Sequence, residues 1–300
     1  MEYQIISDGS CDLSPELTKE KKIDVVPFYV SFDGENYKKE MVEIGIREFY
    51  QEMVEKKGVY PKTSCPSPQD YYNVFEKYAK ENIPVVCICI TIKFSGSMQS
   101  AENAKSIILE NYPNAKIEVI NARINTVLQG IYVLEACRLR DGGYDFEESV
   151  RRLKAIRDSG RIFFTIGDLE YLRHGGRIGK LAGIAGTILG VKPLITLKEG
   201  EIFSSGIARS RKKSMSKVID LLVEYIKEVS ADMKEYTLCI GYGYSYQEAE
   251  EFRETALKVL KEYGVDHIPI YQIGATIGVH TGPYPIGFGI IKRGDYKVNG

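Results

Sequence analysis

The sequence contains no tryptophan and only three histidines, which lie in separate segments. This scarcity argues against a zinc site built on histidines. Six cysteines are present, but no two of them stand in a C-x-x-C arrangement. We therefore expect reduced structural thiols, no metal site and a reducing compartment.

The chain also lacks an excess of either charge, since 40 Lys and Arg oppose 41 Asp and Glu. No broad field would attract a nucleic acid or an anionic membrane. The longest apolar run, Ile83–Ile92, is about half of the ~20 residues that a membrane-spanning helix needs. Met1–Gln4 carries no basic segment of the kind that begins a signal peptide. We expect a cytoplasmic protein with no transmembrane segment, for which only transient membrane contact stays open.

Common catalytic motifs are missing as well. The sequence has no G-x-S-x-G elbow and no G-x-G-x-x-G after a predicted strand. Gly176–Lys180 is followed by Leu181 instead of Ser or Thr, so it does not form a P-loop. These absences leave a binding protein or an unusual enzyme.

What is present is typical of a globular α/β protein. The 300 residues are 44% hydrophobic and 27% charged, and this length favours two domains. Apolar strands alternate with amphipathic helices, as in sheets covered by helices on both faces. Pro84–Thr91 is a continuous apolar run, which indicates a buried parallel strand.

We place a domain boundary at Ser159-Gly160, after a charged helical stretch. Residues 1–159 are predicted to form an α/β domain with a mostly parallel sheet. Residues 160–300 are predicted to form a second α/β domain with a mixed sheet. The turn at Glu199-Gly200 sends the chain back along its preceding strand, which makes that second sheet partly antiparallel.

Four loops carry hydroxyl groups, glycines or single charges at predicted strand ends, where ligands of open α/β sheets usually bind. Each also has a local explanation, because Ser and Asp cap helices and His and Gly occur in turns. The third loop precedes a helix whose N-terminal amides favour an anion. The loops are Ser7–Asp12, Lys62–Pro68, Thr91–Ser97 and Gly278–Pro283.

Two further segments are ambiguous. Arg209 lies in a basic stretch at the start of a predicted helix, where it is either solvated or faces an anionic partner. Leu181–Gly190 is apolar on all sides and rich in glycine. It is either a buried helix with a close neighbour or a helix that leaves room for an apolar ligand.

Read in order, these segments resemble the DegV family of bacterial fatty-acid-binding proteins, and the resemblance covers nearly the whole chain. Each motif is short, but together they follow the family's order and spacing. The matching segments are Asp8–Leu13, Thr63–Ser67, Phe94–Ala101, Asp168–Leu172 with Gly175–Ile178, Gly190–Leu194, Ala208–Lys213 and His280–Pro283.

The resemblance implies two α/β domains that hold one long-chain fatty acid between them. It implies a non-catalytic carrier that presents the carboxylate to a separate fatty acid kinase for phospholipid synthesis, with no other cofactor. The implied carboxylate-binding residues are Thr63, Ser64, Thr91, Ser95, Gly96, Arg209 and His280. The implied residues of the acyl tunnel are Ile92, Leu181, Ile184 and Ile188.

The sequence departs from the family pattern at three places. Ile92 stands where a second serine is common, Asn121-Ala122-Arg123 replaces an Asp-Ser-like pair, and Gly9 replaces a frequent serine. Two alternatives therefore stay open. One is an acyl hydrolase or transferase that uses Ser95 or His280, and the other is a sensor of a different apolar acid. The sequence gives no signal for the length of the acyl chain, the identity of the partner kinase or the oligomeric state.

Overall fold

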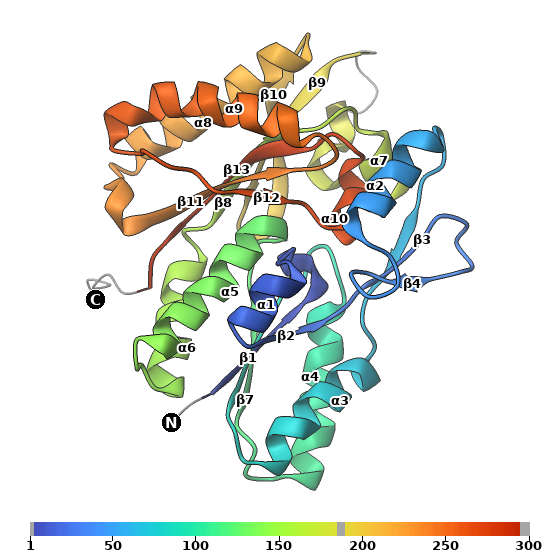
Figure 1. Ribbon diagram of the computed structural model, residues 1–300, viewed down its shortest axis with the longest axis vertical. Coiled ribbons are helices and arrows are strands. Elements are labelled where there is room, and N and C mark those ends of the chain that lie inside the picture. The colour runs from blue at the N-terminus through green and yellow to red at the C-terminus, as the bar shows by residue number, and fades with distance from the viewer. Residues whose placement is uncertain (1–2, 185–189, 295–300) are drawn as a thin grey trace.

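The computed structural model describes residues 3–184 and 190–294 of the chain. A central helix, α5 (Thr126–Asp141), lies between two β-sheets (Figure 1). The first sheet is entirely parallel, with strand order β2-β1-β6-β7. Its strands are β1 (Gln4–Asp8), β2 (Ile23–Val26), β6 (Val85–Cys89) and β7 (Ile117–Asn121).

Helices cover both faces of this parallel sheet because alternate side chains of each strand point to opposite faces. One face packs against α3 (Pro68–Lys80) and α4 (Ser97–Asn111). The other packs against α5 and α6 (Phe146–Arg157). All five residues of β6 are buried, as its apolar sequence predicts.

The second sheet has six strands in the order β10-β9-β8-β13-β11-β12. All its neighbouring pairs are antiparallel except β11 and β12. Its outer face carries α8 (Arg211–Glu228) and α9 (Tyr246–Leu260), at the top of Figure 1. The strands are β8 (Arg161–Thr165), β9 (Lys192–Lys198), β10 (Glu201–Ala208), β11 (Tyr236–Tyr242), β12 (Ile270–Gln272) and β13 (Ile286–Lys292).

The predicted α/β class, with a parallel N-terminal sheet and a mixed C-terminal sheet, is confirmed. α5 connects the two sheets, since it packs on β1 and also on β11 and β13. Most of its residues are buried, and glycines on the second sheet allow this close approach. A methyl group on Gly289 would lie 2.9 Å from the Cβ atom of Leu128.

A small antiparallel sheet, β4-β3-β5, lies beside the two large ones. Around it pack α2 (Ile46–Glu55) and α10 (Ala275–Thr281), which share a small core (Figure 1). The loop predicted at Gly278–Pro283 is therefore wrong over its first four residues, because residues 278–281 form the end of α10. The strands are β3 (Tyr29–Ser31), β4 (Lys38–Lys39) and β5 (Lys62–Ser64).

Several short helices complete the fold of the described residues. The predicted apolar helix at Leu181–Gly190 differs from the observed chain, which forms a 3₁₀ helix that ends at Ile184, while residues 185–189 lie outside the described ranges. No helix within those ranges is long and apolar enough to cross a membrane. The short helices are α1 (Pro15–Glu20), α7 (Glu170–His174), and the 3₁₀ helices η1 (Gly9–Cys11), η2 (Gly179–Ile184), η3 (Met233–Glu235) and η4 (Lys261–Tyr263).

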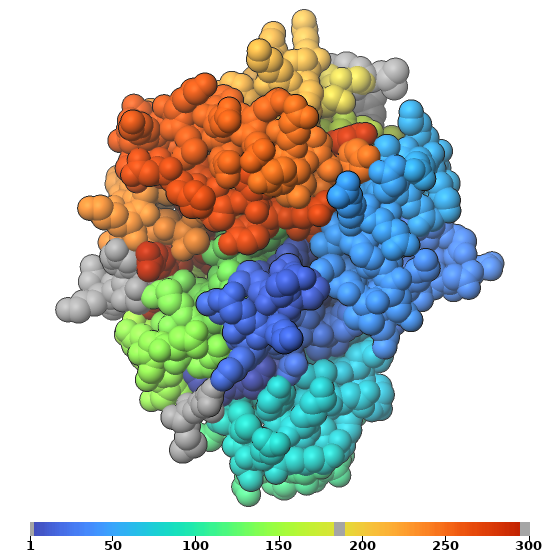
Figure 2. Space-filling model, in the orientation of Figure 1, coloured from blue at the N-terminus to red at the C-terminus, as the bar shows by residue number. Residues whose placement is uncertain are grey.

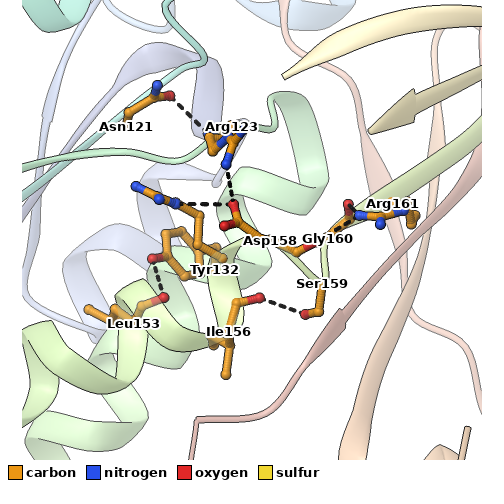
Figure 3. A network of polar contacts seen from close by, with 10 residues as sticks. Asn121, Arg123, Tyr132, Leu153, Ile156, Asp158, Ser159, Gly160 and Arg161 are labelled. Atoms are coloured by element: carbon orange, nitrogen blue, oxygen red, sulfur yellow. Dashed lines mark hydrogen bonds and ion pairs between the residues drawn. The ribbon is translucent and has the colours of Figure 1, made fainter. Parts of the chain in front are cut away.

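The chain passes from α6 into the second sheet at Asp158–Gly160 (Figure 3). Asp158 receives a salt bridge from Arg123 at 2.8 Å, and the hydroxyl group of Ser159 donates to the carbonyl of Ile156 at 2.6 Å. In Figure 2, the segments that follow this junction form most of the upper surface, beside the light-blue segment around α2, and those that precede it form most of the lower surface. Whether the two parts are independent domains with a boundary at Ser159 stays a prediction.

Candidate functional site

A cavity of about 310 Å³ lies where β5, α5, α10 and the second sheet meet. Its volume falls at the lower end of the range for small-molecule sites, roughly 300–1,000 Å³. Most of its lining is apolar, and polar groups gather where β5, α10 and the loop before α4 approach each other. The lining residues are Phe28, Thr63, Ser64, Cys65, Ile90, Phe94, Ser95, Gly96, Asn125, Thr126, Val127, Ile162, Phe164, Leu172, Arg177, Leu197, Ile202, Gly241, Ile273, Thr276, Ile277, His280, Thr281, Pro285, Ile286, Gly287, Phe288 and Gly289.

Five of the predicted carboxylate-binding residues line this cavity. β5 supplies Thr63 and Ser64, and the loop before α4 supplies Ser95 and Gly96. His280 comes from the last turn of α10, and its Nε2 lies 3.2 Å from the hydroxyl oxygen of Thr63. The sequence separates Thr63 from His280 by 217 positions, and the packing of α10 on β5 brings them together.

His280 is uncharged at neutral pH. Burial of the ring and the neighbouring charge of Arg177 lower the pKa of His280 to about 4. Its Nδ1 is buried without a hydrogen-bond partner among the described residues. A neutral imidazole carries one N–H group, which can donate to an anion while the other nitrogen accepts a hydrogen bond.

Gly175 leaves the space that the ring of His280 occupies. A methyl group at this position would overlap Nδ1 and lie 2.9 Å from Cε1. Gly175→Ala is therefore expected to displace the ring and weaken binding of an anionic ligand about fivefold, since a hydrogen bond contributes ~1 kcal/mol. The measurement is the Kd of the variant. Gly167→Ala is the control, because a methyl group there would make only ordinary contacts of 3.7 Å, and equal affinities of the two variants would contradict the prediction.

Arg177 is a cavity residue whose role the sequence did not reveal. Its Nε donates to the carbonyl of Phe94 at 3.1 Å, and Nη1 donates to the carbonyl of Gly175 at 2.9 Å. These bonds hold a cation near His280 at the cavity wall. The only sequence signal was its place in the Gly175–Ile178 motif.

Two predicted carboxylate-binding residues lie outside the cavity lining. The hydroxyl group of Thr91 is buried and donates to the carbonyl of Gly200 at 3.1 Å, so it fixes the β9–β10 turn. Arg209 is exposed after the end of β10. We therefore leave both out of the proposed site.

The predicted tunnel residues also differ from the observed apolar lining. Ile92 is 56% exposed because the chain turns there, with the amide of Phe94 bonded to the carbonyl of Thr91. Leu181 is buried in the core that surrounds α5 but does not line the cavity. The backbone of Ile184 ends η2, whereas its side chain and all of Ile188 lie outside what the structure describes.

The polar groups do not form a nucleophile–base–acid arrangement. The oxygen of Ser95 accepts from the amide of Ser97 at 3.1 Å, and His280 pairs with Thr63 instead of a serine. No carboxylate orients Nδ1 of His280 among the described residues. Within those residues, no group of three or more His, Cys, Asp and Glu side chains is placed to hold a metal ion.

A family model described as "Uncharacterised protein, DegV family" matches residues 2–293. The chain belongs to the DegV family. A DegV domain-containing protein of Clostridium perfringens is 31% identical over 293 residues, which cover 98% of this chain and 100% of that protein.

Solved structures of DegV proteins have the same fold. A stearic-acid-binding protein from Eubacterium ventriosum is 42% identical, with a TM-score of 0.92 and coverage of 97% of this chain and 99% of that one. A fatty-acid-binding DegV protein from Thermus thermophilus is 28% identical, with a TM-score of 0.85 and coverage of 97% and 100%. Both neighbours are described as binding fatty acids.

Proposed function

We propose that this protein binds one long-chain fatty acid in the cavity at the junction of its two parts. The observation that supports this most strongly is a mainly apolar cavity with Thr63, Ser95 and His280 gathered in its wall. An apolar body with a polar cluster matches the two ends of a fatty acid. The stearic-acid-binding protein at 42% identity supports the same ligand class.

In this proposal the carboxylate accepts hydrogen bonds from Thr63, Ser95 and the amide of Gly96, while neutral His280 donates its one N–H group to the hydroxyl oxygen of Thr63. Arg177 supplies the nearby positive charge. The acyl chain packs against the apolar lining, for example Phe164 and Ile202. Burial of about a dozen methylene groups contributes on the order of 10 kcal/mol before ordering costs, whereas each bond to the carboxylate contributes roughly 1.5–3 kcal/mol. The acyl chain of the ligand thus supplies most of the affinity, and the polar groups of the cavity fix the orientation of the ligand.

We further propose that the protein is a carrier, which presents the carboxylate to a separate fatty acid kinase in the cytoplasm. Ser64, Gly96 and Arg177 line the cavity and are also exposed, so the polar groups are reachable from outside. Nδ1 of His280 has no carboxylate partner among the described residues to orient the ring as a general base, which favours a carrier over an acyl hydrolase. The six free cysteines suit a reducing compartment.

The test is to extract the purified protein with organic solvent and identify the released lipid by mass spectrometry. We expect about one fatty acid per chain, or stoichiometric uptake of stearic acid by delipidated protein. Absence of both would contradict the proposed function. A co-purified apolar acid of another class, bound in place of stearic acid, would favour the sensor.

A further inference from the structure

Two carboxyl groups, those of Asp12 and Glu40, lie buried next to the cavity wall. Asp12 is 8% exposed and Glu40 is 2% exposed. A methyl group on Gly274 would overlap Oδ1 of Asp12 and lie 2.6 Å from Oε1 of Glu40. The two carboxyl groups therefore face the same point, directly before α10.

Each carboxyl group holds a threonine of the cavity lining. The hydroxyl group of Thr126 donates to Oδ2 of Asp12 at 2.5 Å. Thr276 donates to Glu40 through both its hydroxyl group and its amide, the latter at 3.1 Å. Glu40 thereby fixes the first turn of α10, whose last turn places His280 against Thr63.

The backbone is strained at Asp12 and at Thr126, and the hydrogen bond between these two residues can hold the strained conformation in place. Asp12 and Thr126 both have a left-handed backbone, with φ of 52° at each residue. For a β-branched residue such as Thr126, this conformation costs on the order of 1–3 kcal/mol. Strain of this kind persists only where surrounding contacts determine the position of the residue.

The surroundings of the pair disfavour two negative charges. Burial raises the pKa of Glu40 to about 7, and burial together with the charge of Glu40 raises the pKa of Asp12 well above its ordinary value. The other titratable groups that face the pair are Asp8, Cys11 and Tyr50. Tyr50 is completely buried, and its hydroxyl group and Oδ1 of Asp12 both lack a partner among the described residues.

We propose that one carboxyl group of the Asp12–Glu40 pair keeps its proton at neutral pH and that the pair thereby positions α10 and, through it, His280 at the polar part of the cavity. While the proton is present, the two carboxyl groups can lie close together and hold Thr126 and Thr276. When it is lost, two buried negative charges repel each other at the start of α10. The part of this proposal that concerns ligand affinity rests on the proposed function.

The direction of the pH dependence follows from the raised pKa values. The folded protein holds a proton that the unfolded chain, whose carboxyl groups titrate near pH 4, has already released. This stabilisation is present at low pH and is lost as the pH rises through about 7, the pKa of Glu40. Asp8, with a pKa raised by burial to about 6, contributes at the lower edge of this range, whereas His280, with a pKa of about 4, titrates below it.

Thermal unfolding and stearic acid binding are measured from pH 6 to pH 8.5 for the wild type, Glu40→Gln and Asp12→Asn. The wild-type Tm is expected to fall by about 3–5 °C over this range. The fall is small because a given loss of unfolding free energy shifts the Tm less in a long chain than in a short one. Glu40→Gln should show less than about half of this fall, and Asp12→Asn should reduce the fall less, because burial still raises the pKa of Glu40 in that variant. Between pH 6 and pH 8.5 the Kd of the wild type should rise about threefold more than the Kd of either variant. Ionisation of the ligand affects all three proteins equally, so it cancels in this comparison.

Glu135→Gln is the matched control, because Glu135 is a buried carboxylate paired with Arg138 and should leave the wild-type slope unchanged. A wild-type Tm that is flat or rises between pH 6 and pH 8.5 would overturn the proposed proton on the pair. Equal slopes for the wild type and Glu40→Gln would do the same. If both pair variants fail to fold, the position of the wild-type fall decides: a midpoint near pH 7 supports the pair, and a fall that is complete near pH 6, where Asp8 titrates, contradicts it. Absence of stearic acid binding at every pH would contradict the proposed function, while the unfolding profiles would still decide on the proton.

Discussion

Replacing Thr63 with alanine is expected to raise the Kd for a long-chain fatty acid about 10- to 100-fold. The change removes a hydroxyl group that lines the cavity and lies 3.2 Å from Nε2 of His280. A hydrogen bond to a charged oxygen contributes roughly 1.5–3 kcal/mol, and each 1.4 kcal/mol is a tenfold change in affinity. The loss also leaves the buried ring of His280 without its one hydrogen-bonding neighbour among the described residues.

Two variants, Ser64→Ala and Thr63→Ser, serve as controls. Ser64 is exposed, so water can replace its hydroxyl group, and Ser64→Ala should change the Kd less than about threefold. Thr63→Ser keeps the hydroxyl group and should restore most of the affinity. Isothermal titration with stearic acid measures all three. Equal and near-zero effects of Thr63→Ala and Ser64→Ala would remove Thr63 from the proposed site.

The motifs were the part of the candidate site that sequence could predict, since Thr63, Ser64, Ser95, Gly96 and His280 all line one cavity. Only Ser95 and Gly96 lie in a loop after a strand, whereas Thr63 and Ser64 lie within β5 and His280 lies in α10. Local rules place a hydroxyl group or a glycine after a strand wherever the rest of the chain goes. That these residues bind a carboxylate stays a prediction.

The residues that sequence misplaced depend on longer-range packing. Ile92 points to solvent because of one turn, and Arg209 ends a long hairpin strand that carries it away from the cavity. Arg177 reaches the cavity only through its bonds to two carbonyl groups. Nothing in the sequence around Glu40 distinguishes it from exposed charges nearby, since its burial results from contact with α10.

The same contrast between local and long-range effects predicts that Gly130→Ala destabilises the protein by about 1–2 kcal/mol, against the helix propensity of alanine. Alanine in a helix interior is favoured over glycine by about 1 kcal/mol. In α5, however, a methyl group at position 130 would overlap the carbonyl oxygen of Cys11 and lie 2.9 Å from Cδ2 of Leu13. The first of these atoms is backbone and cannot rotate away, so η1 or α5 must shift, and overpacking of this kind typically costs about 1–3 kcal/mol or more.

The measurement is the free energy of unfolding by urea, with Ser106→Ala in α4 as the control. Ser106 is exposed on its helix, so alanine there should stabilise by a few tenths of a kcal/mol through propensity alone. Because Asp12 directly follows η1, a shift of η1 would also disturb the bond from Thr126 to Asp12. Gly130→Ala should therefore lower both stability and affinity for stearic acid, whereas a stability equal to or above that of the wild type would show that α5 and η1 are not in the tight contact described.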